Sequence, residues 1–251
     1  MKSCAIRVIT VAFCLAVAGG SVFGQAAAST NAAPQSPPWN ISAAAGLTLT
    51  RGNSKTLLTT ANLTGARKWS QNELGLGLDG AYGENNSVKN VESIHGFGQY
   101  NRLFTQRIFG YLRVEGLHDG IADIDYRLSV GPGAGYYFIK NTNTTLRAEA
   151  GPGYIYERDR NGDTYSYMSL RLAERLEQRI SATAKLWQTV EILPQVDKFG
   201  NYILNAEIGV EAAMTTKLSL QTYLQDLYHS QPATGRQKND LKLVAGVKYK
   251  F

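Results

Sequence analysis

Cysteine is almost absent from this sequence, which has two among its 251 residues, Cys4 and Cys14. Positions 15–251 therefore cannot provide a disulfide framework, a cysteine nucleophile or a thiolate metal site. A chain without cysteine suits passage through an oxidising compartment.

The sequence also lacks a hydrophobic run long enough for a membrane-spanning helix, which needs about 20 residues. The longest run, Val8–Ala18, follows two basic residues and precedes small residues with a cleavage site near Gly24 or Ala26. This layout predicts a secretory signal peptide over residues 1–24, so we expect the mature protein to leave the cytoplasm.

Neither sign of charge dominates. The formal net charge is +6, and removing the signal peptide takes away two basic residues and no acidic ones, which leaves 26 − 2 − 20 = +4. This excess is too small to indicate binding to nucleic acid, and we expect no such partner.

Residues 25–38 are small, polar and rich in proline, and they predict a short flexible leader. No comparable linker follows. Residues 39–251 are therefore expected to form one domain, of a size that all-β barrels commonly reach as a single unit.

The C-terminal residues alternate without a break between an apolar and a polar face, which is the pattern of a β-strand. The apolar positions are Leu241, Leu243, Ala245, Val247, Tyr249 and Phe251. A tilted strand of about 9 to 11 residues crosses a bilayer in a transmembrane barrel. The ending on Tyr249 and Phe251 resembles the assembly signal of bacterial outer-membrane barrels, which predicts the barrel-assembly machinery as a partner. This strand alone fits the edge of a soluble β-sandwich equally well.

The whole of residues 39–251 divides into about twelve strand candidates, an even number as single-chain bacterial barrels require. Alternation is cleanest over residues 39–49, 74–82, 127–138, 146–157 and 202–212. Residues 169–178 are rich in helix formers and alone fit a short amphipathic helix, but their place in the series favours a strand. The predicted fold is all-β, an antiparallel transmembrane β-barrel of about twelve strands.

The expected connections alternate in length, with residues 51–54 as a short member of the longer set. The short ones lie near residues 70–72, 105–106, 140–143, 178–181 and 215–216. The longer ones lie near residues 84–90, 119–125, 158–163, 194–198 and 229–238. This alternation is typical of outer-membrane barrels, whose short turns are periplasmic.

Aromatic residues collect toward the ends of the predicted strands, where the girdles of a membrane barrel would lie. They are Trp39, Trp69, Tyr82, Phe104, Tyr154, Tyr156, Trp187, Tyr202 and Tyr228.

Five motifs carry a family resemblance. They are GNS at 52–54, GPGAGYYF at 131–138, GPGYIYE at 151–157, YHSQPATGRQKND at 228–240 and the terminal GVKYKF. In these motifs, residues 39–251 resemble the salt-induced outer-membrane protein family, domain-of-unknown-function family 481 (DUF481). The resemblance implies a β-barrel of unsettled function and brings no catalytic residues with it.

The two GPG runs, beginning at Gly131 and Gly151, fall on neighbouring predicted strands. Proline removes a donor from the ladder and is unusual in a paired strand. We expect a local bend or bulge that curves the barrel wall, rather than a kink that narrows the lumen or opens a lateral gap.

Support for enzyme chemistry is weak. We interpret His95, His118 and His229 as loop or rim residues, because no nucleophile, base and orienting group converge on them in the predicted fold. The DRNGD segment at 159–163 has the oxygen spacing of the start of a calcium loop but lacks the expected glycine and glutamate, so an exposed turn is favoured. We therefore expect no catalysis, no metal and no cofactor.

Charged residues of both signs occupy the predicted inward face of the strands. They are Arg67, Glu73, Asp79, Arg113, Glu115, Arg127, Arg147, Glu149, Arg171, Arg175, Lys185, Glu191, Glu207, Glu211, Lys242 and Lys248. Those chosen as lumen-lining are Arg127, Arg147, Glu149, Arg171, Arg175, Glu207 and Glu211. They fit a narrow polar pore whose arginines favour anionic solutes, or a salt-bridged filling that closes the barrel.

The sequence thus predicts a protein of the Gram-negative outer membrane, surrounded by outer-membrane lipid. Its role is either that of a structural barrel linked to envelope stress or that of a narrow pore for small polar solutes. A soluble periplasmic β-barrel or sandwich that binds a ligand is the alternative, and an outer-membrane hydrolase is a weaker one.

Overall fold

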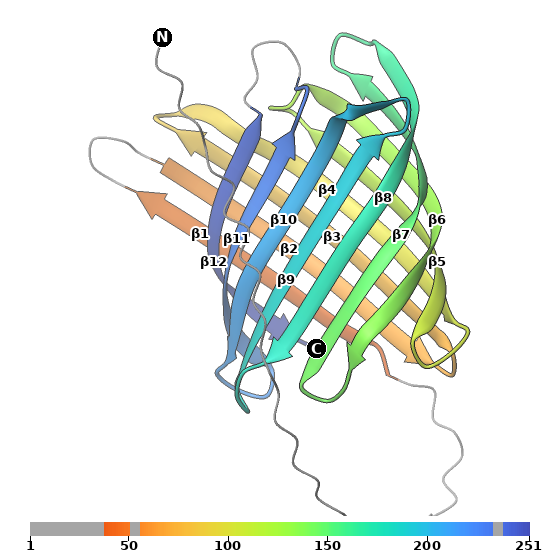
Figure 1. Cartoon of the computed structure of the whole chain (residues 1–251). Coiled ribbons are helices and arrows are strands. Elements are labelled where there is room, and N and C mark those ends of the chain that lie inside the picture. The colour runs from red at the N-terminus through yellow and green to blue at the C-terminus, as the bar shows by residue number, and fades with distance from the viewer. Residues whose placement is uncertain (1–37, 51–55, 233–237) are drawn as a thin grey trace, which may run out of the picture. The chain divides into compact units, whose positions relative to one another are not determined.

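The computed structural model describes residues 38–50, 56–232 and 238–251. Twelve antiparallel strands in these ranges form one closed barrel (Figure 1). The strands are β1 Asn40–Thr50, β2 Thr56–Trp69, β3 Asn72–Asn85, β4 Val88–Leu103, β5 Ile108–Asp119, β6 Ile124–Lys140, β7 Thr144–Asp159, β8 Thr164–Arg179, β9 Ala184–Gln195, β10 Lys198–Ala213, β11 Leu218–His229 and β12 Asn239–Lys250. The predicted all-β barrel is confirmed, and residues 169–178 lie in a strand.

Some expectations fall outside the described residues: the signal peptide, nearly all of the leader, the turn at 51–54 and much of the 229–238 connection. Among the residues that are described, no helix is long and apolar enough to cross a membrane.

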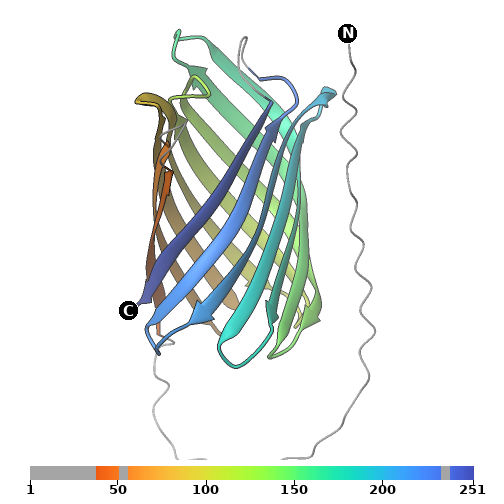
Figure 2. The same ribbon diagram turned by 90° about the vertical axis from the view of Figure 1, so that its left-hand side faces the viewer.

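The strands follow one another around the barrel in chain order, and β1 pairs with β12 to close it. The closing register runs from Ser42 opposite Lys250 to Gly46 opposite Gly246. Beyond it, the Phe251 N–H donates to the carbonyl oxygen of Ile41 at 3.1 Å. All the strands are steeply inclined to the barrel axis (Figure 2). We call the end that holds the start of β1 and the finish of β12 the terminal end, and the other the opposite end.

The predicted alternation of short and longer connections is wrong. At the opposite end, β3 and β4 are joined by Asn86 and Ser87 alone, and β9 and β10 by Val196 and Asp197. Asn86 and Ser87 have positive φ angles of 50° and 64°, as in a type I′ hairpin turn. Glu84 pairs with Lys89 and Gln195 with Lys198, so polar residues continue the ladder up to the turns. Polarity indicates contact with water and not the loss of strand pairing.

The GPG runs face one another on β6 and β7. The register is the same before and after them, with Val130 opposite Tyr154 and Ala134 opposite Ala150, so the expected bulge is absent there. A Cβ atom at Gly131 would collide with the carbonyl oxygen of Pro152. Glycine therefore permits a close approach of the two backbones, and register shifts lie elsewhere on this strand pair.

The outer face of the barrel is apolar and exposed. Its side chains include the following residues, each with between 41% and 60% of its surface accessible: Leu47, Leu63, Leu78, Val114, Leu128, Leu172, Val210, Leu243 and Val247. Tyr82, Tyr154, Phe104 and Trp39 are also exposed. A wall of this kind has the chemistry of a lipid-facing surface.

Two sequence-based assignments to a face are wrong. Arg67 is opposite Leu74, whose side chain points outward, so Arg67 lies on the outer face, 5.8 Å and 5.7 Å from the ring centroids of Trp39 and Trp69. Trp187 is not part of a girdle. It points inward over Gly209, where a Cβ atom would collide with its ring.

Candidate functional site

The interior of the barrel is the candidate site, and strand register decides which side chains reach it. Side chains alternate between the two faces of a strand, and paired residues share a face. The register places every charged residue of the predicted inward set except Arg67 on the inner face.

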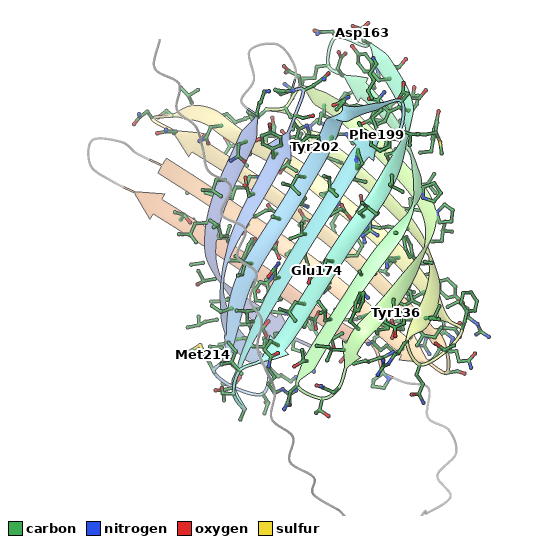
Figure 3. All side chains as sticks on the ribbon, in the orientation of Figure 1. Tyr136, Asp163, Glu174, Phe199, Tyr202 and Met214 are labelled. Carbon is green, nitrogen blue, oxygen red and sulfur yellow. The ribbon has the colours of Figure 1, made fainter. Side chains whose placement is uncertain are left out.

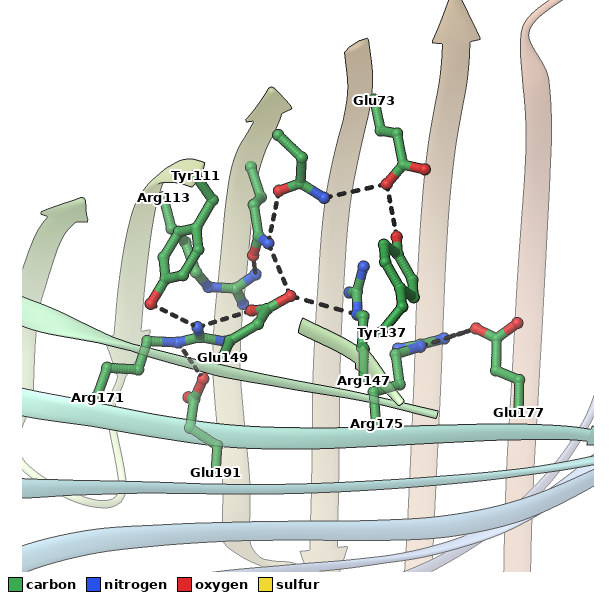
Figure 4. A network of polar contacts seen from close by, with 12 residues as sticks. Glu73, Tyr111, Arg113, Tyr137, Arg147, Glu149, Arg171, Arg175, Glu177 and Glu191 are labelled. Atoms are coloured by element: carbon green, nitrogen blue, oxygen red, sulfur yellow. Dashed lines mark hydrogen bonds and ion pairs between the residues drawn. The ribbon is translucent and has the colours of Figure 1, made fainter. Parts of the chain in front are cut away.

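Glu149 on β7 is the centre of a polar network (Figure 4), and its side chain is 4% exposed. Arg171 donates to it from Nη1 at 2.8 Å, and Gln99 donates from Nε2 at 3.1 Å. The Nε atom of Arg147 lies 3.3 Å from Glu149 Oε1. Arg171 also donates from Nε to Glu191 at 2.6 Å, so this guanidinium joins two carboxylates.

Three contacts of the network cross the interior between strands that are not neighbours. Gln99 on β4 reaches Glu149 on β7, and Arg171 on β8 donates to the Tyr111 hydroxyl on β5 at 3.2 Å. The Tyr137 hydroxyl on β6 donates to Glu73 on β3 at 2.7 Å. These contacts fill the side of the lumen enclosed by β3–β8.

An aromatic cluster supports this filled side. Phe109, Tyr111 and Tyr137 are nearly inaccessible, and the Phe109 and Tyr137 rings lie 5.1 Å apart. A Cβ atom at Gly133 would collide with the Tyr111 ring, and one at Gly135 with the Phe109 ring. The glycines of β6 therefore let these rings lie against the inner wall.

Three further inward arginines also have carboxylate partners. Arg113 donates from Nε to Glu115 at 2.6 Å, and Arg127 does so to Glu157 at the same distance. Arg175 pairs with Glu177 at 2.8 Å. All four arginines predicted to line the lumen, Arg127, Arg147, Arg171 and Arg175, thus lie in ion pairs, and their charges are largely offset.

Glu207 and Glu211 on β10 lie on the other side of the interior. The Trp187 indole N–H donates to Glu207 at 2.6 Å. Glu211 forms ion pairs with Lys185 and Lys248, both at 3.1 Å. These last residues line a cavity of about 420 Å³ at the terminal end, together with Arg179 and Lys250.

Part of the interior is open. The inward Asp79, in the middle of β3, keeps 46% of its side-chain surface accessible, and Arg175 keeps 43%. Glu177 and Lys185 are similarly exposed. Because a closed wall surrounds these groups, their accessible surface faces space inside the barrel.

The histidines occupy three different strands. His95 points inward, with Nδ1 2.9 Å from Asp79 and Nε2 4.0 Å from Glu115, so its interpretation as a loop or rim residue is wrong. His118 Nδ1 lies 2.6 Å from the carbonyl oxygen of Asp125, and His229 ends β11.

The DRNGD segment forms the exposed turn after β7, in which Asp159 accepts a hydrogen bond from the Asp163 N–H at 2.9 Å. Within the described ranges, no three His, Cys, Asp or Glu side chains are grouped so that they could hold a metal ion.

Several uncharged members of the site were missed by sequence reasoning, among them Gln99, Asn101, Tyr111, Tyr137 and Trp187. The alternation of inward and outward positions along each strand would have identified them. Each shares a strand face with an inward charge or pairs with one, as Gln99 does with Arg113.

The family model that matches this sequence covers residues 43–251 and is described as a protein of unknown function, DUF481. The chain belongs to the DUF481 family. No curated protein matches the sequence.

Solved structures similar to this DUF481 protein include the NanC porin, with a TM-score of 0.55 and 9% identity over 84% of this chain and 100% of that chain. The KdgM porin has a TM-score of 0.47 and 9% identity, covering 85% and 99%. The translocator domain of the autotransporter NalP from Neisseria meningitidis has a TM-score of 0.44 and 16% identity, covering 85% and 87%. The NanC similarity shows a shared fold, that of a β-barrel.

Proposed function

We propose that this DUF481 protein is a Gram-negative outer-membrane barrel with a narrow, water-filled pore for small polar solutes. The observation that carries this proposal is the exposure of the inward Asp79 in the middle of β3. A carboxylate is stable there only if it is paired or hydrated, and its accessible surface requires internal water.

The membrane placement is supported by the outer face, which exposes large apolar side chains around the barrel. A soluble periplasmic barrel would leave this whole wall in water, whereas monomeric soluble proteins rarely expose apolar patches of more than a few hundred Å². The terminal end would then face the periplasm, with Tyr249 and Phe251 available to the assembly machinery.

The pore would be narrow and only weakly selective for charge. The network around Glu149 fills one side, and the accessible charges that remain include Asp79 and Glu177 as well as Arg175 and Lys185. These charges are of both signs and largely cancel, so the arginines are poor candidates for an anion filter. We expect uncharged and zwitterionic solutes to pass about as readily as small ions.

The alternative is a filled structural barrel, which is favoured by the buried contacts across the interior. An association with salt or envelope stress, which the family resemblance implies, remains a prediction. No step of catalysis is proposed, because no residue of the network has the arrangement of an activated nucleophile.

Cysteine accessibility tests the pore. Asp79→Cys faces the lumen and its neighbour Leu78→Cys faces outward, so the two form a matched pair in a domain without other cysteines. With the protein in planar bilayers, a water-soluble, positively charged methanethiosulfonate reagent should lower the current through Asp79→Cys and leave Leu78→Cys unchanged. Equal effects on both variants, or none on either despite measurable current, would rule out a pore past Asp79.

A further inference from the structure

One carboxylate lies on the outer face in mid-wall. Glu174 on β8 is opposite Ala148 on β7 and Val190 on β9, all on the apolar face. Gln188 on β9 shares that face and donates from Nε2 to Glu174 Oε2 at 3.4 Å, a long hydrogen bond. Figure 3 shows Glu174 near the middle of the wall, well above Met214 at one end and below Tyr202 toward the other.

This pair is poorly satisfied where it lies. Acyl chains offer no hydrogen bonds, and ionisable groups inside a membrane usually face protein or water. The inward carboxylates described above each have a polar contact shorter than 3 Å or an ion pair, for example Glu149 with Arg171 and Glu207 with Trp187, whereas Glu174 has the long contact with Gln188. The outer faces of β3 and β12 carry apolar side chains and glycine between their ends, for example Leu76 and Leu243.

The wall is hollowed at this point. A groove of about 610 Å³ lies over β6–β9, with Ala134, Ala148 and Ala150 in its floor and Leu172, Ile192 and Tyr136 beside them. Small residues on a lipid-facing surface allow a neighbouring protein to approach closely, and this approach drives packing in membranes. Here they flank Glu174.

We propose that a second copy of this chain occupies the groove, related by a two-fold axis along the membrane normal. The inference rests on the membrane placement proposed above but not on the pore. Copies inserted in the same direction keep each residue at the same depth, so Glu174 and Gln188 of one copy meet the same pair of the other. Gln188 has N–H donors and Glu174 has acceptors, so the pair is self-complementary, as an isologous interface requires.

Site-specific cross-linking tests the proposal. Ala148→Cys is next to Glu174 in the groove, and Ala61→Cys on the outer face of β2 is the matched control, both with Cys4 and Cys14 replaced by alanine. A short bis-methanethiosulfonate cross-linker added to outer-membrane fractions should yield dimer from Ala148→Cys and about tenfold less from Ala61→Cys. Equal yields would indicate random collision and overturn the proposal.

The polar pair is tested in the Ala148→Cys background. Glu174→Leu with Gln188→Leu should lower the dimer yield about tenfold, the effect of losing two membrane hydrogen bonds. Glu174→Gln keeps donors and acceptors and should retain the dimer.

Heat-modifiable migration shows that each variant is a folded barrel. An unchanged yield from the double leucine variant, or a monomer that carries a lipid lost on Glu174→Leu in native mass spectrometry, would overturn the proposal. Absence from the outer-membrane fraction would instead contradict the membrane placement.

Discussion

At the scale of single residues, the contribution of an inward arginine to stability depends more on the burial of its partners than on its charge. Arg171 joins Glu149 and Glu191 and is 12% exposed, so its removal would leave two buried carboxylates without their main partner. Arg175 pairs with Glu177 in a more open position. These two arginines, four residues apart on β8, are a natural comparison.

Arg171→Gln should therefore lower the free energy of unfolding by about 3 kcal/mol, as loss of one partner from a buried pair does. Arg175→Gln should cost less than about 1 kcal/mol, because its ion pair is exposed. Equilibrium unfolding in urea, with refolding into lipid vesicles, measures both values. Equal losses would mean that the Glu149 network contributes no more than an exposed pair.

The residues that sequence reasoning placed wrongly have physical reasons in common. β2 lacks clean alternation, so only its register with β3 shows that Arg67 points outward. Trp187 has the amphipathic character of a girdle residue, and only the missing side chain at Gly209 makes room for it inside. The contacts of Gln99, Tyr111 and Tyr137 were also missed, because they join strands that are not neighbours.

At the scale of elements, the strands were predictable because alternation of period two reports directly on the two faces of a barrel wall. The lengths of the connections were not predictable, because polar residues in β3 and β4 continue the ladder up to a two-residue turn. The clearest strand in the sequence, β12, is also the one that closes the barrel against β1.

Because β12 closes the barrel, we expect assembly to be sensitive to substitutions at the end of this strand. Phe251→Asp should reduce the yield of folded barrel in outer-membrane fractions, with accumulation or degradation in the periplasm, because an unclosed edge is not stable in lipid. Phe104→Asp is the matched control, since both phenylalanines are 67% exposed and lie at the terminal end. Heat-modifiable migration and immunoblotting of the fractions measure the outcome. Normal yield from the Phe251 variant, or equal loss from both, would count against a role of Phe251 in assembly.

At the scale of the whole molecule, the barrel combines an apolar outer wall, an ion-paired sector inside and an open remainder. The apolar outer wall was predictable from the sequence, and so was the set of inward charges. The division of the lumen into a filled and an open side was not, because it depends on contacts between β3 and β6, β4 and β7, and β5 and β8.

Single-channel recording of the purified, heat-modifiable barrel in planar bilayers tests the central claim most directly. The open side of the lumen predicts small, uniform current steps, and the mixed charges around Asp79 and Arg175 predict a reversal potential near zero in a potassium chloride gradient. Barrels that insert and remain heat-modifiable, yet carry no current, would contradict the pore and leave a filled structural barrel.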